Sequence, residues 1–296
     1  MFHQPKKKLP ILINKNVDIK DNDSLPLFLI HPGGGEITCY NTLGSFIDSR
    51  KMYGIEFPYN EIKDVFHTPH FKMEWLADLY AQKIMSVVQG PCIIGGWSAG
   101  GTIAYAITKR MEQLGCSIPL VVMIDSACPN VYREQKDKIA KVNYQSLMFY
   151  IGKLNNYFTS PVLFNDLEKN KAFDLNMYLP DLMCFVYEKL DIRKRIKKEI
   201  SIELLDRFHY TIEGIVRAVL DYHITGNVEN ILFIKAEQSD ISTANAWEKY
   251  SKQKMHLHEI LKTSHLTIVE KEYVEQLKQV IDQCTENLYS VPGFAP

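Results

Sequence analysis

The sequence predicts an α/β fold class, with a mostly parallel, doubly wound sheet and an inserted helical lid. Three observations support this class. Short apolar runs typical of buried strands alternate with stretches of helical periodicity in both terminal parts of the chain. One of these runs, PLVVMIDS at residues 119–126, is uninterrupted, as in a strand covered on both faces. Residues 127–227 are instead rich in aromatic side chains and mainly helical in pattern, which indicates an insertion.

The composition is that of an ordinary globular chain. It has 296 residues, of which 46% are hydrophobic and 23% charged, with a formal net charge of -1. This balance excludes disorder and a generally basic nucleic-acid-binding surface, and the length suffices for a sizeable core. Six cysteines are scattered without metal-ligand spacing, so we expect reduced thiols and no metal site. No segment resembles a signal peptide or a membrane span, so a cytoplasmic protein is expected.

The first part of the predicted α/β core covers residues 25–126. It follows residues 1–24, which are polar and are expected to form a leader or linker. The elements alternate in the order strand 25–32, helix 36–47, strand 51–58, helix 71–88, strand 92–97, helix 100–115 and strand 119–126. The helices are indicated by apolar residues every three or four positions, and two of them end at glycines, Gly90 and Gly115.

The second part of the predicted core covers residues 228–296, after the helical lid at 127–227. Its predicted elements are a strand at 230–237, a helical stretch at 245–253, a short last strand near 258–265 and an amphipathic helix at 272–288. The α/β alternation therefore resumes after the insertion, as expected of one sheet built from both parts.

Ser98 is the central residue of a Gly-x-Ser-x-Gly motif, at a point where a strand is predicted to turn directly into a helix. Such a turn lifts the serine above the sheet, and Gly96 and Gly100 leave room for it because a Cβ would collide with neighbouring backbone. The hydroxyl can attack a carbonyl once a base removes its proton. The Ala99 N–H, at the positive end of the helix, is expected to stabilise the oxyanion. We interpret Ser98 as a nucleophile, against the alternative that small residues here only shape the turn.

A glycine-rich segment, HPGGGE, follows the first predicted strand. An oxyanion hole needs a second N–H donor, and we expect Gly33 to supply it because glycines let the backbone approach a tetrahedral intermediate closely. The alternative is a flexible turn before a helix. We interpret His31 as structural, and Glu36 as a first-turn acid that complements the dipole of the following helix.

His265 is the preferred general base among nine histidines. An imidazole titrates near neutral pH and has one nitrogen for the serine and another for an orienting acid. In the chain order of α/β-hydrolases, this histidine lies between the last strand and the final helix, where His265 occurs. His256 and His258 are expected in an exposed turn. His209 and His223 fall in or near the lid, where a substrate-facing role competes with a position on the helix surface.

Two aspartates are candidates for the orienting acid. Asp125 ends the strand that follows the nucleophile's helix, and Asp240 follows the next strand, which is the commoner position in α/β-hydrolases. Topology alone allows both. We favour Asp125 because the apolar run before it would place its carboxylate at the carboxyl edge of the sheet, where α/β active sites lie. Asp240 is the alternative.

These motifs resemble those of the thioesterase domains that end non-ribosomal peptide and polyketide synthases, in the α/β-hydrolase superfamily. Such domains carry a His-Pro-x-Gly-Gly loop, a Gly-Trp-Ser-x-Gly-Gly elbow after a Gly-Pro pair, and an apolar strand ending in Asp-Ser. The matching residues are 31–35, 96–101, 90–91 and 125–126. The residues expected to support the elbow and the loop are Gly34, Gly35, Gly96, Trp97, Gly100 and Gly101. The resemblance covers residues 25–129 and 207–288, and departs from the family where a serine replaces the glycine that often precedes the histidine.

The resemblance implies release of an acyl, polyketide or peptidyl chain from the phosphopantetheine arm of an acyl or peptidyl carrier protein. An acyl-serine would be resolved by hydrolysis or macrocyclisation, in an acyl pocket shaped by the lid and without a bound cofactor. The alternatives are a serine esterase or lipase for a free small molecule, and a catalytically silent binding module. The basic residues at 193–198 and 6–8 are candidate docking surfaces for an acidic carrier, against the alternative of ordinary solvated faces.

Overall fold

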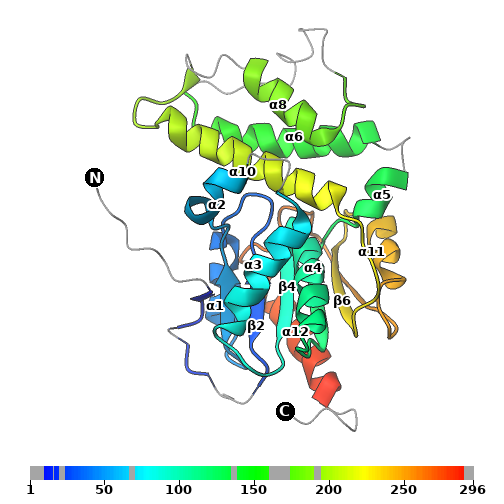
Figure 1. Cartoon of the computed structure of the whole chain (residues 1–296). Coiled ribbons are helices and arrows are strands. Elements are labelled where there is room, and N and C mark those ends of the chain that lie inside the picture. Colours follow the sequence, from blue (N-terminus) through cyan, green and yellow to red (C-terminus); the bar gives the residue numbers. More distant parts are fainter. Residues whose placement is uncertain are drawn as a thin grey trace.

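Within the residues that the structure describes, seven strands form one sheet in the order β1-β3-β2-β4-β5-β6-β7 (Figure 1). The computed structural model describes residues 10–15, 17–19, 24–66, 71–134, 139–159, 174–189 and 195–289. The strands are β1 (Ile11–Leu12), β2 (Leu27–Ile30), β3 (Met52–Ile55), β4 (Ile93–Trp97), β5 (Leu120–Ile124), β6 (Ile231–Ala236) and β7 (His256–Ile260). Neighbouring strands from β3 across to β7 are parallel, and β1 pairs antiparallel with β3. This topology confirms the predicted mostly parallel, doubly wound sheet.

Helices cover both faces of the sheet, and this explains why its central strands are apolar throughout. One face carries α3 (Met73–Met85), α4 (Ala99–Gln113) and α11 (Ile241–Glu248), and the other carries α1 (Asn41–Phe46) and α12 (Val274–Tyr289). Along β2, Phe28 and Ile30 pack on the face covered by α3, α4 and α11, whereas Leu27 and Leu29 pack on the face covered by α1 and α12. Successive strand side chains point to opposite faces, so a slip of one residue would exchange the two sets.

The N-terminal segment differs from the expected leader or linker. Residues Ile11 and Leu12 form the edge strand β1 on β3. Asn14 is 3% exposed, and its Nδ2 donates to the carbonyls of Ile47 at 3.0 Å and Arg50 at 2.8 Å. Its Oδ1 accepts a hydrogen bond from the Met52 N–H at 2.9 Å. Part of the segment expected to be a linker therefore belongs to the sheet. The buried amide side chain of Asn14 attaches this segment to the end of α1 and the start of β3.

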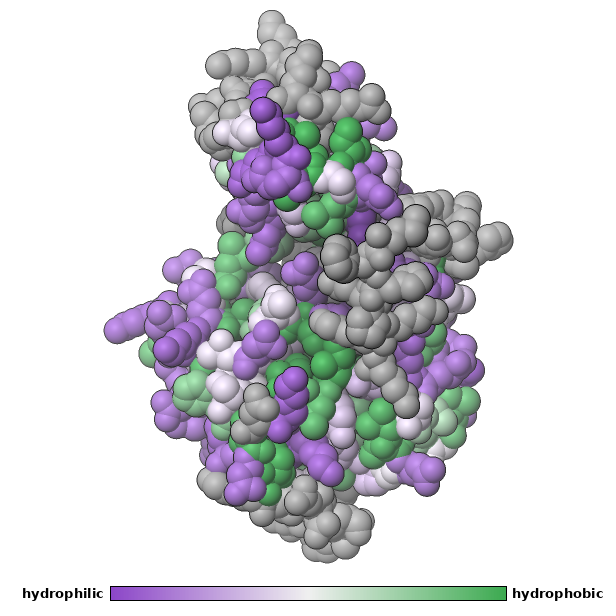
Figure 2. Space-filling model, turned by 90° about the vertical axis from the view of Figure 1, so that its left-hand side faces the viewer, coloured by the Kyte–Doolittle hydropathy of each residue, from purple (hydrophilic) through white to green (hydrophobic). Residues whose placement is uncertain are grey.

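A layer of helices lies above the carboxyl edge of the sheet, as Figure 1 shows. Its helices are α5 (Pro129–Glu134), α6 (Ile139–Asn155), α8 (Leu179–Lys189) and α10 (Ile202–Asp221). The layer has its own apolar core, which includes Leu147, Leu182 and Leu205. The C-terminal half of α10 instead contributes Ile215 and Val219 to the core of the α/β body. Figure 2 shows a narrower waist between the two parts, where apolar side chains reach the surface.

His209 occupies neither of the two positions weighed for it. It is 1% exposed, its Nδ1 is hydrogen-bonded to Tyr150 Oη at 2.6 Å, and its ring stacks on Tyr187 with centroids 3.9 Å apart. It is therefore a core residue of the helical layer, and the expectation of a surface or substrate-facing residue was wrong. His223 is exposed, as expected of a surface residue.

Two smaller expectations need correction. Glu36 precedes the short 3-10 helix η1 (Thr38–Tyr40), and neither η1 nor α1 has an acidic residue in its first turn. His256 and His258 are exposed, as expected, but they lie in β7 and not in a turn.

The remaining described helix, α2 (Tyr59–Phe66), packs Ile62 against the core. No helix in the described part of the chain has both the length and the apolarity to cross a membrane.

Candidate active site

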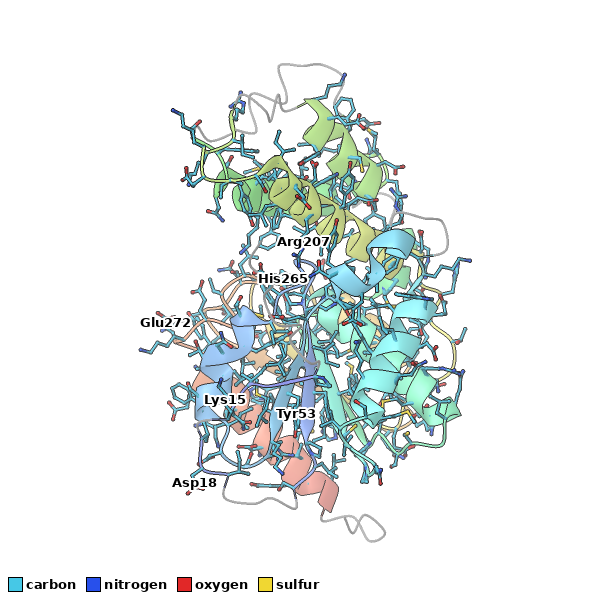
Figure 3. The ribbon with its side chains drawn as sticks, turned by 60° about the vertical axis from the view of Figure 1, so that its left-hand side comes forward. Lys15, Asp18, Tyr53, Arg207, His265 and Glu272 are labelled. Atoms are coloured by element: carbon cyan, nitrogen blue, oxygen red, sulfur yellow. The ribbon has the colours of Figure 1, made fainter. Side chains whose placement is uncertain are left out.

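Ser98, His265 and Asp125 meet at the carboxyl edge of the sheet, each on a loop that follows a strand. His265 Nε2 lies 3.0 Å from Ser98 Oγ, and His265 Nδ1 lies 2.7 Å from Asp125 Oδ2. Ser98 joins β4 to α4, Asp125 directly follows β5, and His265 lies between β7 and α12. Figure 3 shows His265 above the sheet, with Arg207 of α10 over it. The three groups therefore form one continuous hydrogen-bond chain beneath the helical layer.

The elbow holds Ser98 in a backbone conformation that L residues rarely adopt. Its φ is 58° and its ψ is -125°, at a cost of about 1–3 kcal/mol for such a conformation. The Ser98 N–H donates to the Ile124 carbonyl at 2.9 Å, which fixes the turn to β5. A Cβ on Gly96 would lie 2.5 Å from the backbone of Gly100, and a Cβ on Gly101 would overlap Ser126 Oγ. The glycines of the elbow are therefore required by close packing around the turn.

The Asp125 carboxylate is held in place by hydrogen bonds from three residues. Besides His265, its carboxylate accepts hydrogen bonds from the Ala236 N–H at 3.0 Å and from the Ser239 hydroxyl at 2.6 Å. Burial would raise the pKa of Asp125, but the hydrogen bond and charge of His265, with those two further donors, hold it below its usual value. The carboxylate is therefore ionised near neutral pH and accepts a hydrogen bond from the Nδ1–H group of His265.

This charge state fixes the roles of the two imidazole nitrogens. Because the Asp125 carboxylate can only accept, neutral His265 carries its proton on Nδ1. Nε2 is then free to accept the proton of the Ser98 hydroxyl. The arrangement has the geometry of a nucleophile, a base and an orienting acid.

Asp240, the alternative acid, has a different contact. It is the N-cap of α11, and its Oδ1 accepts a hydrogen bond from the Ser242 N–H at 2.8 Å. Such a cap satisfies one of the free N–H groups at the start of a helix. The structure thus brings Asp125, and not Asp240, to Nδ1 of His265.

Three backbone N–H groups near Ser98 are free to bind an oxyanion. Those of Gly33, Gly34 and Ala99 donate to no group among the described residues. A Cβ on Gly33 or Gly34 would have no atom within 4 Å, so the space beside this loop is open. Gly35, with a φ of 80°, lies against Thr211 of α10, which connects the loop to the helical layer. The pair Gly33 and Ala99 stays a prediction.

His31 is a structural residue of this loop. It is fully buried, and its Nδ1 donates to the Pro32 carbonyl at 2.8 Å. Nε2 therefore accepts the hydroxyl proton of Tyr80 at 2.7 Å. Burial lowers the pKa of His31 to about 4, against the opposing effect of the Pro32 carbonyl. An imidazole that is uncharged near neutral pH thus ties the loop to α3.

Two contacts around Trp97 escaped the sequence analysis. The Tyr40 hydroxyl donates to the Ile30 carbonyl at 2.8 Å and accepts from the Trp97 N–H at 2.7 Å, so it joins the ends of β2 and β4. The Trp97 indole N–H donates to the His265 carbonyl at 2.9 Å, with the two rings 5.5 Å apart. Trp97 therefore orients the histidine loop, a role that no local sequence signal reveals.

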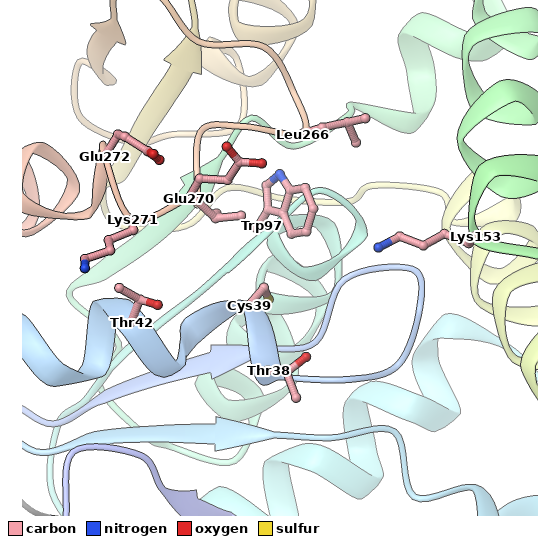
Figure 4. Close-up of a pocket in the computed structure, with 10 residues that line it drawn as sticks. Thr38, Cys39, Thr42, Trp97, Lys153, Leu266, Glu270, Lys271 and Glu272 are labelled. Carbon is pink, nitrogen blue, oxygen red and sulfur yellow. The ribbon is translucent and has the colours of Figure 1, made fainter. Parts of the chain in front are cut away.

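A cleft between α6 and the His265 loop adjoins these residues. It consists of two cavities of about 590 and 630 Å³. Both are lined by Trp97, Lys153, Leu266 and Glu270, and Figure 4 shows Lys153 extending from α6 towards the Trp97 ring. Trp97 precedes Ser98 and Leu266 follows His265 in the chain, so the cleft borders the site, with neither Ser98 nor His265 among the residues that line it.

The cleft has two arms of different chemistry. The smaller cavity continues along Thr38, Thr42, Lys271 and Glu272, and its lining is mixed, because Cys39 and Val269 also belong to it. The larger one continues along Tyr144, Met148, Phe149 and Gly152 of α6, and is mainly apolar. Tyr144 and Met148 are 41% and 39% exposed, so the helical layer presents an uncovered apolar stripe to this space.

Three other features were considered from the sequence: the basic segments, the cysteines and a metal site. Arg193, Lys194 and the basic residues 6–8 lie outside the described residues, whereas Lys197 donates from Nζ to the Asn156 carbonyl at 2.9 Å. The six cysteines are free thiols, three of them buried. In the described ranges, no group of three or more His, Cys, Asp or Glu side chains could hold a metal ion.

Comparison with known proteins adds a family assignment. A family model described as a thioesterase domain matches residues 25–287. The chain is 32% identical over 111 residues to a non-reducing polyketide synthase, StmB, of Aspergillus ustus. This match covers 37% of the chain and 5% of that protein. It is 23% identical over 289 residues to the polyketide synthase PksR of Bacillus subtilis (strain 168), covering 90% of the chain and 11% of that protein. The chain thus corresponds to a small part of each synthase.

Solved structures show the same fold. The crystal structure of a four-domain non-ribosomal peptide synthetase, holo-AB3403 bound to AMP and glycine, matches with a TM-score of 0.63 at 22% identity. The match covers 93% of the chain and 20% of the synthetase. At this level of identity the likeness concerns the fold alone.

Proposed function

The chain belongs to the thioesterase-domain family, and on this premise we propose that it releases an acyl, polyketide or peptidyl chain from a carrier-protein phosphopantetheine thioester through an acyl-serine intermediate. The observation that carries the proposal is the hydrogen-bond chain from Ser98 through His265 to Asp125. The relatives named as polyketide synthases, of which this chain matches one part, support a carrier-bound substrate.

In the proposed reaction, His265 Nε2 takes the Ser98 proton while Oγ attacks the thioester carbonyl. The carbonyl oxygen becomes an oxyanion, which the N–H groups of Gly33 and Ala99 would stabilise. Collapse breaks the carbon–sulfur bond, and His265 returns the proton to the departing thiolate of the carrier arm. Asp125 stabilises the imidazolium that exists between these two proton transfers.

The acyl-serine is then resolved by a second nucleophile. A water molecule, or a hydroxyl or amine of the chain itself, transfers its proton to His265 and attacks the acyl carbon. Collapse returns the proton to Ser98 Oγ and releases an acid, a macrolactone or a macrolactam. Hydrolysis and macrocyclisation use the same residues, so the choice between them depends on which nucleophile the lid admits.

The apolar arm of the cleft is the proposed site of the acyl chain. Tyr144, Met148 and Gly152 recur every four residues and so lie on one face of α6. From Tyr144 to Gly152 this face extends for about 12 Å along the helix axis. Phe149 adds a second aromatic ring to the lining. An extended apolar or aromatic chain matches this surface.

Gly152→Trp tests this assignment. The indole is expected to fill the apolar arm and to lower kcat/KM for long acyl thioesters by about tenfold or more, with little effect on an acetyl thioester. The measurement is kcat/KM for a series of acyl-N-acetylcysteamine thioesters of increasing length.

Gly152→Ala is the matched control. A Cβ there meets no atom within 4 Å, so turnover should stay unchanged. Helical propensity should make this variant more stable by about 1 kcal/mol. If Gly152→Trp slowed short and long substrates equally, the chain would bind elsewhere.

The activity itself is tested by intact-protein mass spectrometry after mixing with a panel of acyl-carrier thioesters. We expect a mass increase equal to the acyl group, located on Ser98, and faster turnover of carrier thioesters than of simple esters. Turnover of free esters without reaction of any carrier thioester would support an esterase instead. Absence of any Ser98 adduct, even with a fluorophosphonate, would support a silent binding module.

A further inference from the structure

A lysine is buried in the sheet two strands away from the nucleophile's strand. Lys235 is the penultimate residue of β6 and is 5% exposed. An ammonium group is costly to remove from water unless it is fully hydrogen-bonded or paired. Lys235 takes no part in the reaction proposed above, so its burial needs an explanation.

The contacts of Lys235 are concentrated on the loop that follows β6. Its Nζ donates to the carbonyls of Ala236 at 2.7 Å, Glu237 at 3.0 Å and Ser239 at 3.0 Å. A carboxylate oxygen of Glu259, on the neighbouring strand β7, lies 2.6 Å away. The three carbonyls belong to residues 236–239, which are the last residue of β6 and the short loop after it. The ammonium therefore fixes the conformation of this loop by binding three of its carbonyls.

The same loop supplies both of the further donors to Asp125. The Ala236 N–H donates to Oδ1, and the Ser239 hydroxyl donates to Oδ2, the oxygen that also accepts from His265. The two ends of the loop that Lys235 binds are therefore the two points that hold the acid. A shift of the loop would release the carboxylate on both sides.

The loop is also attached to the segment that carries the base. The Glu237 N–H donates to Thr263 Oγ1 at 3.3 Å, and the Gln238 N–H donates to the Thr263 carbonyl at 3.1 Å. Thr263 is fully buried, two residues before His265. One loop thus contacts both the acid and the approach to the base.

We propose that Lys235 is a positioning residue for the reaction at Ser98, which fixes residues 236–239 so that Ser239 and the Ala236 N–H hold Asp125 against His265. This inference rests on the proposed function of Ser98, His265 and Asp125. Lys235 touches none of the reacting atoms and acts only through the loop. Ser239 is the second positioning residue, because its hydroxyl is the link between that loop and the carboxylate.

The test compares Lys235→Met, Ser239→Ala and the double variant. The probe is an acetyl-N-acetylcysteamine thioester, and kcat is expressed per serine titrated with a fluorophosphonate, so that unfolded protein is not counted. We expect kcat to fall about 10- to 100-fold in Lys235→Met and about tenfold in Ser239→Ala, with KM unchanged, because misplacing a catalytic group slows the chemical step. The double variant should be no slower than Lys235→Met, since both changes act on the same contact.

Lys252→Met is the control, because Lys252 is a half-exposed lysine that also pairs with a carboxylate, that of Glu229. Its kcat should match that of the unmodified protein. Wild-type kcat per titrated serine in Lys235→Met, or losses that multiply in the double variant, would overturn the inference. If Lys235→Met does not fold, Ser239→Ala decides alone, and an unchanged kcat overturns it. Failure of the proposed function is separate, because then Ser98→Ala would retain turnover.

Discussion

Ser98→Ala is expected to lower thioester turnover by roughly 10⁴- to 10⁶-fold, the loss typical of removing the nucleophile from a triad that acts as a unit. The variant lacks the atom that forms the acyl-enzyme, while the N–H groups of Gly33, Gly34 and Ala99 and the cleft along Trp97 remain. The residual rate would come from binding and from oxyanion stabilisation alone. The measurement is steady-state turnover of a carrier-bound acyl thioester, with intact-mass detection of the acyl adduct.

The control for this prediction is His265→Ala combined with Ser98→Ala. Because the serine and the histidine act in one proton transfer, the double variant should be about as slow as either single variant. Binding of the loaded carrier to Ser98→Ala, measured by titration, should be preserved. Turnover within about tenfold of the unmodified protein would show that another residue forms the intermediate.

The second large effect is expected for Asp125→Asn, with a loss of about 10⁴-fold in kcat. An asparagine can donate its amide hydrogen to Nδ1 of His265, which would then carry its proton on Nε2, the nitrogen that faces Ser98. The imidazole in that state cannot accept the serine proton. The loss should therefore appear in the acylation rate, measured by stopped-flow release of the thiol.

Asp240→Asn is the matched comparison, because it makes the same chemical change at the alternative acid. Asparagine caps helices about as well as aspartate, so α11 should keep its N-cap and turnover should stay close to that of the unmodified protein. The reverse result, a large loss at Asp240 and retained activity at Asp125, would exchange the two assignments.

The features that the sequence predicted well are those with a local cause. The strands of the core are visible because residues such as Leu27 to Ile30 are covered on both faces and must all be apolar. Ser98 is visible because a sharp turn needs glycines at fixed distances from it. The family assignment follows from these same segments, and the structure brings Ser98, His265 and Asp125 together, although their catalytic roles remain predictions.

The features that escaped prediction depend on residues far apart in the chain. Strand β1 has only two residues, and Asn14 is held by contacts to residues more than thirty positions away. Lys235 looks like a polar interruption of an apolar strand until the carbonyls around it are known. His209 could not be placed, because the burial of a helical histidine depends on which helices cover it, here α6 and α8.

The turn at Ser98 has a consequence for the stability of the protein as a whole. A residue with a φ of 58° and a ψ of -125° costs free energy that glycine would not. Asp125, with a φ of 45°, is likewise in a region that glycine adopts without strain. Glycine at residue 98 would therefore relieve backbone strain, whereas glycine at residue 125 would also remove the acceptor of the Ala236 N–H and the Ser239 hydroxyl. Laboratory evolution that selects for heat resistance alone would therefore favour glycine at residue 98, and would remove the hydroxyl that the proposed reaction requires.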